Sequence, residues 1–224
     1  MKSSNFFVLS AVLFVAACGA SSSSNDVDED VEESSVEVPS VEEPGIERSS
    51  VEDVSLNEII TRYDDFLVVN GVDEFFGVDI ADIIPTSGTA NYSGMIFVGE
   101  NGIVTSETFG AYGAVALTVA FSDETTIAGE AGSFFQLDDP FIADVADATG
   151  DPIEGSATID FGQVSGANSF EGSIVGSVSP LEGGEIAFDM DALGVFTHED
   201  AKGFVGFAGD DAAGVDGVIL ATED

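Results

Sequence analysis

The sequence predicts an all-β protein: a closed eight-stranded antiparallel barrel over residues 85–224, preceded by a short helix and a disordered acidic tether. Three observations predict this arrangement. After Pro85, apolar and polar residues alternate in eight short runs, which stretches rich in Gly, Asn and Ser separate. Glycines recur inside the runs, as sharp bends at barrel corners require. Before Pro85, the apolar spacing is that of a helix, and further upstream it disappears.

Residues 1–17 have the layout of a secretory signal peptide. Lys2 supplies a positive end, residues 6–15 form an apolar run, and Ala16 and Ala17 close the segment. The run holds about ten residues, whereas a membrane-spanning helix needs roughly 20. The segment is therefore predicted to direct export and not to span a membrane.

Cys18, the only cysteine of the chain, directly follows this segment. Residues 15–18 (Val-Ala-Ala-Cys) resemble the lipobox of bacterial lipoproteins, in which the cysteine carries the lipid. The alternative is an ordinary signal peptide with an incidental thiol. Two or three acyl chains make membrane attachment stable, where one chain gives only marginal binding. Because Gly19 and not aspartate follows, we predict lipidation of Cys18 and anchoring in the outer membrane; the face on which the domain lies stays open.

The chain is strongly acidic, with 43 Asp and Glu against 4 Lys and Arg and a formal net charge of −39. A field of this sign repels nucleic acid and anionic lipid, so both are poor partners and no nucleic-acid partner is predicted. Two explanations remain open. Acidity spread over the whole chain is typical of adaptation to salty water, whereas attraction to a basic partner or a cation is the alternative.

Residues 18–54 are dominated by Ser, Glu, Asp, Val and Pro and contain no aromatic residue. Such a composition cannot bury enough apolar surface to offset chain entropy, which predicts disorder. A flexible chain of this length spans about 30–35 Å, and repulsion between like charges extends it further. We expect this segment to be a tether that lifts the folded domain from the membrane.

Residues 55–84 are predicted to form a short helix and a loop. Ser55 and Glu58 have the spacing of a capping box, and Asn70 with Gly71 is a plausible end. The apolar residues at helical spacing are Leu56, Ile59, Ile60, Tyr63 and Leu67. We expect a helix over residues 56–69 that packs on the domain and plugs one end of it.

The eight runs are predicted to be the strands of the barrel. They cover residues 90–99, 114–122, 125–135, 156–164, 169–179, 185–190, 202–209 and 215–222. Asp160, Glu171 and Asp189 lie mid-run, opposite the apolar positions, so one face is core and the other is wet. A barrel integral to the outer membrane would need an apolar band facing outward, so we predict a soluble barrel instead.

Three stretches of this region, residues 85–94, 116–132 and 167–179, together with glycine-containing runs near the end, resemble the barrel domain of transferrin-binding protein B. At residues 203–218, two such runs flank the acidic stretch that begins with Asp210 and Asp211, in the order typical of that family. The resemblance covers residues 85–224 and implies an eight-stranded barrel displayed on the cell surface. One barrel without a handle domain is present, so no binding residue is carried over.

No catalytic, cofactor-binding or metal-binding residue is predicted. The sole histidine, His198, has no second histidine or cysteine nearby in the chain and is interpreted as a solvated turn residue. Calcium is the ion that the acidic, glycine-containing residues 146–154 and 208–216 fit best, but neither matches an EF-hand loop. Cys18, as the lipidation site, is the one functional residue that the sequence assigns.

We therefore expect a monomeric, non-enzymatic lipoprotein whose barrel binds a ligand. By the resemblance, the ligand is an iron or haem carrier or another protein. The alternatives are a carrier of a small molecule held in the barrel, as in lipocalins, and a structural or adhesive lipoprotein without a discrete ligand. Exposed aromatic residues on loop tips would favour a protein ligand, and a large apolar cavity would favour a small one.

Overall fold

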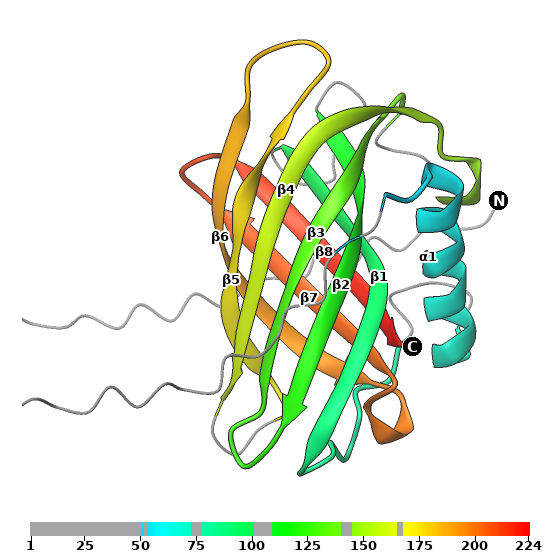
Figure 1. Cartoon of the computed structure of the whole chain (residues 1–224), viewed down its shortest axis with the longest axis vertical. Helices are drawn as coiled ribbons and strands as arrows, with labels where there is room; N and C mark the ends of the chain where they lie inside the picture. Colours follow the sequence, from blue (N-terminus) through cyan, green and yellow to red (C-terminus); the bar gives the residue numbers. More distant parts are fainter. Residues whose placement is uncertain (1–50, 52, 73–77, 101–108, 140–144, 165–167) are drawn as a thin grey trace, which may run out of the picture. The chain divides into compact units, whose positions relative to one another are not determined.

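The computed structural model describes residues 51, 53–72, 78–100, 109–139, 145–164 and 168–224 (Figure 1). The predicted signal peptide, Cys18 and nearly all of the predicted tether lie outside these residues and stay predictions. None of the helical stretches among the described residues has the length and apolar content that crossing a membrane requires.

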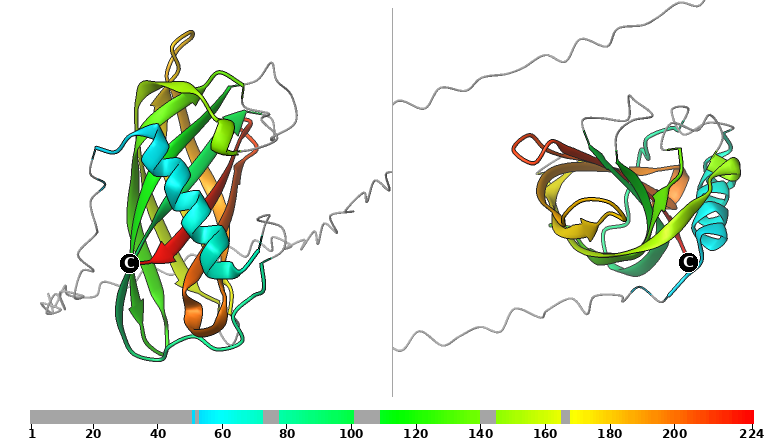
Figure 2. Two further views of the ribbon diagram at one scale, coloured as in Figure 1. Left: turned by 90° about the vertical axis from the view of Figure 1, so that its right-hand side faces the viewer. Right: turned by 90° about the horizontal axis from the view of Figure 1, so that it is seen from above.

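Eight antiparallel strands close into one barrel in chain order (Figures 1 and 2). Consecutive strands pair with one another, and β8 pairs with β1 to complete the ring. The predicted fold class is thereby confirmed. The strands are β1 (Gly88–Glu100), β2 (Gly110–Phe121), β3 (Thr126–Leu137), β4 (Gly150–Gln163), β5 (Phe170–Ser179), β6 (Ile186–Thr197), β7 (Gly203–Asp210) and β8 (Val215–Glu223).

Each predicted run corresponds to one strand; most strands extend beyond their predicted runs, β4 and β6 by the largest amounts. β4 begins at Gly150. Its first residues, which include acidic residues and a proline, pair with the part of β3 that follows a bulge. β6 continues to Thr197, past the end of the 185–190 run. Its second half places small residues, Ala192 and Gly194, on the inner face, which weakens the alternation on which a strand prediction depends.

Alternate residues of every strand point into the barrel and form its core. Asp160, Glu171 and Asp189 are exposed on the outside, as predicted. Phe196 lies at the centre of an aromatic cluster, with ring centroids 5.1–5.8 Å from those of Tyr92, Phe121, Phe170 and Phe204. The fully buried inner side chains include Tyr92, Ile96, Leu117, Ile127, Phe134, Ile159, Phe170, Ile174, Phe196 and Phe204.

The bulge in β3 turns Phe134 into the core. The register between β3 and β4 shifts between Ala131 and Phe134, and Ser133 takes a positive φ of 50°. A Cβ atom at Gly113 or Gly155 would come within 2.6 or 2.9 Å of the Phe134 ring. These two glycines therefore leave the space that the ring fills.

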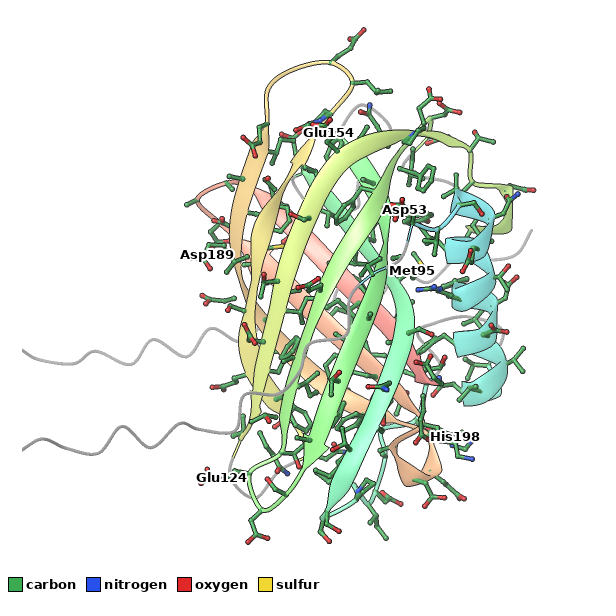
Figure 3. All side chains as sticks on the ribbon, viewed as in Figure 1. Asp53, Met95, Glu124, Glu154, Asp189 and His198 are labelled. Carbon is green, nitrogen blue, oxygen red and sulfur yellow. The ribbon has the colours of Figure 1, made fainter. Side chains whose placement is uncertain are left out.

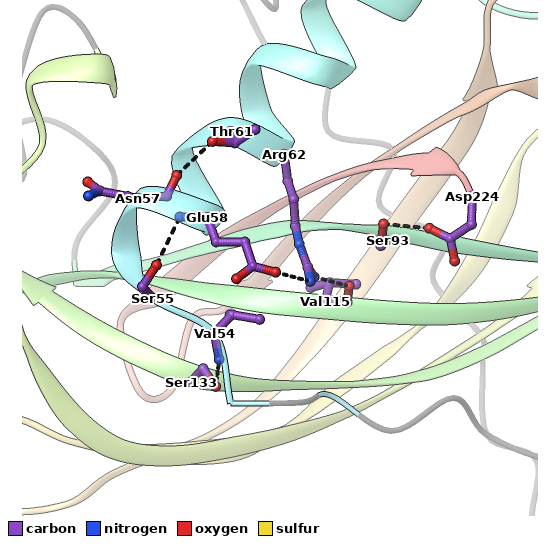
Figure 4. Close-up of polar contacts among 10 residues, drawn as sticks. All are labelled: Val54, Ser55, Asn57, Glu58, Thr61, Arg62, Ser93, Val115, Ser133 and Asp224. Atoms are coloured by element: carbon purple, nitrogen blue, oxygen red, sulfur yellow. Dashed lines mark hydrogen bonds and ion pairs between the residues drawn. The ribbon is translucent and has the colours of Figure 1, made fainter.

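The helix α1 (Leu56–Asn70) begins and ends where the sequence predicts. The Ser55 hydroxyl accepts a hydrogen bond from the Glu58 amide at 3.3 Å (Figure 4). Gly71 adopts a left-handed conformation with φ 64° and caps the last turn. The Glu58 carboxylate pairs with Arg62 at 3.3 Å.

The prediction that this helix plugs an end of the barrel is wrong, because α1 lies along the outer wall (Figure 2). Outward-facing apolar residues of several strands attract it, and Arg62 donates a hydrogen bond to the Val115 carbonyl at 3.5 Å. The Val54 amide also donates to the Ser133 hydroxyl at 3.3 Å, which ties the preceding residues to β3. The buried cluster between helix and wall includes Ile59, Ile60, Phe66, Met95, Phe97, Tyr112 and Leu220.

Candidate functional site

The inside of the barrel is filled by its own side chains. Tyr92, Phe196 and Phe204 are almost fully buried, and a Cβ atom at Gly194 would overlap the Phe204 ring. The Tyr92 hydroxyl donates a hydrogen bond of 2.5 Å to the Ala201 carbonyl, and burial raises the pKa of this tyrosine well above its usual range. A ligand inside this part of the barrel would have to displace packed aromatic rings.

One end of the barrel is covered by residues 78–84, which the sequence indicated only as loop. Ile80 forms an isolated antiparallel bridge with Thr197 at the end of β6. The Ala81 amide donates to the Phe196 carbonyl at 2.9 Å, and the His198 amide donates to the Asp79 carbonyl at 3.0 Å. Ala81 is buried in the inner core, so this segment closes the barrel where the helix was expected to do so.

The connection from β6 to β7 at this end is strained. His198 has φ 65° and ψ 162°, a conformation essentially restricted to glycine. Asp200 and Ala201 follow with φ 65° and 59°. Each such residue costs about 1–3 kcal/mol and persists only where surrounding contacts hold it. Here the bond from Tyr92 holds Ala201, and strain of this kind concentrates at functional sites.

Buried polar atoms without a hydrogen-bond partner lie near the same end. Among the described residues they are Thr197 Oγ1, Asn168 Oδ1 and Asn70 Oδ1. The Asn168 amide donates to the Ala81 carbonyl, so its oxygen lies beside the covering segment. A Cβ atom at Gly203 would overlap the Thr197 hydroxyl and come within 3.0 Å of Asn70 Nδ2. Buried polar atoms normally have hydrogen-bond partners, so this end combines missing hydrogen bonds with backbone strain.

We define the closed-end site as residues 79–83 and 198–200, which line a surface hollow of about 500 Å³. Ile80 and Ile83 are 60% and 75% exposed. Carboxylates surround these two apolar side chains, on Asp79, Asp82, Glu199 and Asp200. Figure 3 shows His198 at this end, whereas Asp53 and Glu154 lie toward the opposite end. The site combines exposed apolar area with negative charge.

The structure places His198, interpreted from the sequence as a solvated turn residue, half-exposed in the closed-end site. Its Nδ1 atom lies 2.8 Å from the Glu199 carbonyl oxygen. Sequence reasoning missed the other half of the site, because residues 79–83 have no regular periodicity. The three isoleucines at positions 80, 83 and 84, next to acidic residues, were the available signal.

The acidic stretch 208–216, considered for calcium, forms the turn between β7 and β8. Asp210 Oδ1 accepts hydrogen bonds from the Ala212 and Ala213 amides, both at 2.9 Å, and its Oδ2 accepts one from the Asp189 amide at 3.0 Å. The bond from Asp189, followed by those from the turn, lowers the pKa of Asp210. Among the described residues, no group of three or more His, Cys, Asp or Glu side chains is arranged to hold a metal ion.

Asp210→Asn is expected to destabilise the protein at pH 7, and the difference from the unsubstituted protein should shrink on acidification. Because folding lowers the pKa of Asp210, its contribution is present above the ordinary value of 3.8 and is lost as the pH falls through the folded value. Urea unfolding at pH 7 and pH 3 measures this. Asp211→Asn, which removes the same charge from the same turn, is the control; an equal effect of both variants would contradict the assignment.

No family model matches the chain. No curated protein matches it. Among solved structures, a crystal structure of a surface lipoprotein aligns with a TM-score of 0.43 and 13% sequence identity. The alignment covers 65% of this chain and 65% of the other, so the chain spans about two thirds of that protein.

The assignment of the barrel rests on its own strand pairing. The resemblance to the transferrin-binding protein B barrel implied a closed ring of eight strands, and the chain forms one. Membership of that family stays a hypothesis, as do the ligands that it implies.

Proposed function

We propose that this protein is a lipoprotein anchored in the outer membrane through Cys18, whose barrel is a non-catalytic module that binds another protein at the closed-end site. The observation that carries the proposal is the strained connection at residues 198–201, set beside exposed Ile80 and Ile83 on a filled barrel. Binding residues are typically found on loops that a rigid scaffold positions. By the resemblance, iron or haem carriers are the first ligands to test.

The polar residues of the outer wall favour a barrel that is surrounded by water and not by lipid. Asp160, Glu171 and Asp189 are exposed in the middle of their strands, whereas a lipid-facing wall is apolar at these depths. A tether that begins at a lipidated Cys18 then accounts for membrane attachment. Filling of the interior by aromatic rings disfavours the lipocalin-like alternative, since such a carrier needs an open cavity.

Protease treatment of intact cells that express the full chain tests attachment and location. The barrel is expected to be released from intact cells by cleavage within residues 18–54, and Cys18→Ser is expected to abolish incorporation of labelled palmitate. Protection until the outer membrane is opened would place the barrel in the periplasm. Palmitate incorporation equal to that of the unsubstituted protein would refute the anchor.

A matched pair of variants tests the closed-end site. Ile83→Glu removes exposed apolar area from the site, and Leu181→Glu makes a similar change in the β5–β6 turn at the opposite end, where Leu181 is 58% exposed. Cells displaying each full chain are incubated with iron-loaded transferrin and with a haem-carrying protein. We expect binding of one carrier, lost on Ile83→Glu and retained on Leu181→Glu. Equal loss in both variants would contradict the site, and no binding by the unsubstituted protein would favour a structural or adhesive role.

A further inference from the structure

A second hollow, separate from the closed-end site, lies on the outer wall of β5–β8. It is a groove of about 570 Å³ lined by residues of four consecutive strands. Its lining residues are Glu171, Gly172, Asp191, Ala192, Leu193, Phe207, Ala208, Gly209 and Asp216. Figure 3 labels Asp189, which lies on β6 near this groove, on the side of the barrel away from α1.

The apolar part of the groove is a pair of side chains on neighbouring strands. Leu193 of β6 and Phe207 of β7 are register partners, and they are 60% and 48% exposed. Glu171 is the register partner of Leu193 on the other side, so a carboxylate ends this row. Cross-strand partners lie about 4.5–5.5 Å apart at Cβ, which makes Leu193 and Phe207 one continuous apolar surface.

The adjacent row places two carboxylates on either side of a glycine. Gly209 of β7 is the register partner of both Asp191 of β6 and Asp216 of β8. Neighbouring strands are about 4.7–4.9 Å apart, so the two aspartates stand on strands about 9–10 Å apart with no side chain between them. A Cβ atom at Gly209 would come within 3.1 Å of Asp216 Oδ1, so this carboxylate leans over the glycine.

We propose that this groove binds an arginine side chain presented by a basic peptide segment of a partner protein. The guanidinium group enters the gap above Gly209, where its fork of donors reaches Asp191 and Asp216. The aliphatic stem of the arginine lies on Leu193 and against the ring of Phe207. Neighbouring apolar residues of the same peptide extend this contact along the row.

Charge selects this occupant over the alternatives. The groove lining contains three carboxylates and no Lys or Arg. A second copy of this chain, with a net charge of −39, would be repelled, and so would the acidic residues 18–54 of the chain itself. Arginine suits the gap better than lysine, because a planar fork bridges two separated carboxylates and an ammonium group is a single point charge.

Fluorescence anisotropy of a labelled Leu-Arg-Leu-Arg-Leu peptide with the full chain in nonionic detergent tests the proposal. The combined variant Asp191→Asn, Asp216→Asn should weaken binding about tenfold or more, since two charge-assisted contacts are lost. Gly209→Ala should weaken it about fivefold although it changes no charge, because a methyl group then occupies the gap. The Leu-Lys-Leu-Lys-Leu peptide should bind more weakly than the arginine peptide. The Asp151→Asn variant, with an exposed carboxylate on β4, controls for net charge.

Gly209→Ala and the unsubstituted protein have the same acidic residues 18–54 and the same net charge. A difference in peptide affinity between them therefore cannot come from either. The proposal would be overturned if Gly209→Ala bound the peptide as tightly as the unsubstituted protein and if Asp191→Asn and Asp151→Asn lost equal affinity. Attraction of the peptide to the net charge alone would then explain the binding. Thermal unfolding of each variant confirms that it is folded. Ile83→Glu should leave peptide binding unchanged, so this test and that of the closed-end site fail independently.

Discussion

Phe196→Ala is expected to lower the free energy of unfolding by about 3–5 kcal/mol, the range for truncating a buried phenylalanine to alanine. Phe196 is fully buried, and its ring contacts those of four other aromatic residues on the inner wall. Strands on several sides hold these neighbours in place, so the cavity cannot collapse easily. Since domains of this size have a total stability of about 5–15 kcal/mol, the variant should be close to unfolding. Urea denaturation of the full chain, followed by circular dichroism, measures the loss.

Phe207→Ala is the matched control for this substitution. Phe207 lies on the outer wall and is 48% exposed. Full burial of such a side chain contributes about 1.5–3 kcal/mol, so its removal should cost only about 1 kcal/mol. A loss at Phe196 no larger than that at Phe207 would show that the inner aromatic cluster is not the core of the fold.

Gly172→Ala is expected to destabilise the barrel by about 3 kcal/mol, at the upper end for overpacking. The added Cβ atom would overlap the Asp160 carbonyl oxygen and lie 2.7 Å from the Cα atom of Phe161. Both are backbone atoms of β4, the neighbouring strand, so no side-chain rotation relieves the clash. Relief requires β4 and β5 to separate, which lengthens their hydrogen bonds. The same denaturation experiment measures the effect.

Gly162→Ala provides the control on the neighbouring strand. Gly162 pairs with Glu171, one residue from the partner of Gly172, and nothing lies within 4 Å of a Cβ atom added there. This variant should change stability by no more than about 0.5 kcal/mol. If both alanine variants lost the same stability, the effect would come from the glycine backbone itself and not from the close approach of β4 to β5.

Much of this fold could be predicted because its signals are local. In the run at residues 169–179, strict alternation placed Phe170, Ile174 and Val178 on one face, and all three are in the core. The helix ends followed from Ser55 and Gly71, whose capping bonds involve residues only a few positions away. Patterns of this kind are read within a single segment, so distant contacts do not disturb them.

The position of the helix and the covering of the barrel end depend on contacts between distant segments. Met95 and Phe97 flank Ile96 in β1, so both faces of the strand are apolar at this point. The prediction of a wet outer face did not take this pattern into account, and the pattern does not say what covers the face. The bridge from Ile80 to Thr197 joins residues more than a hundred positions apart through backbone atoms, which leave no mark in the side-chain pattern.

The attachment of α1 to the wall also determines how the barrel responds to mechanical load. The chain enters at the N-terminal end of the helix, beside the Val54–Ser133 hydrogen bond, and reaches the covering segment only after the C-terminal end. A pull on the chain before Val54 therefore loads the Val54 contact first, then the buried residues Ile59, Ile60 and Phe66 between the helix and the wall, and only afterwards residues 78–84. We therefore expect the contacts of α1 with the wall to be loaded before the strained connection at residues 198–201.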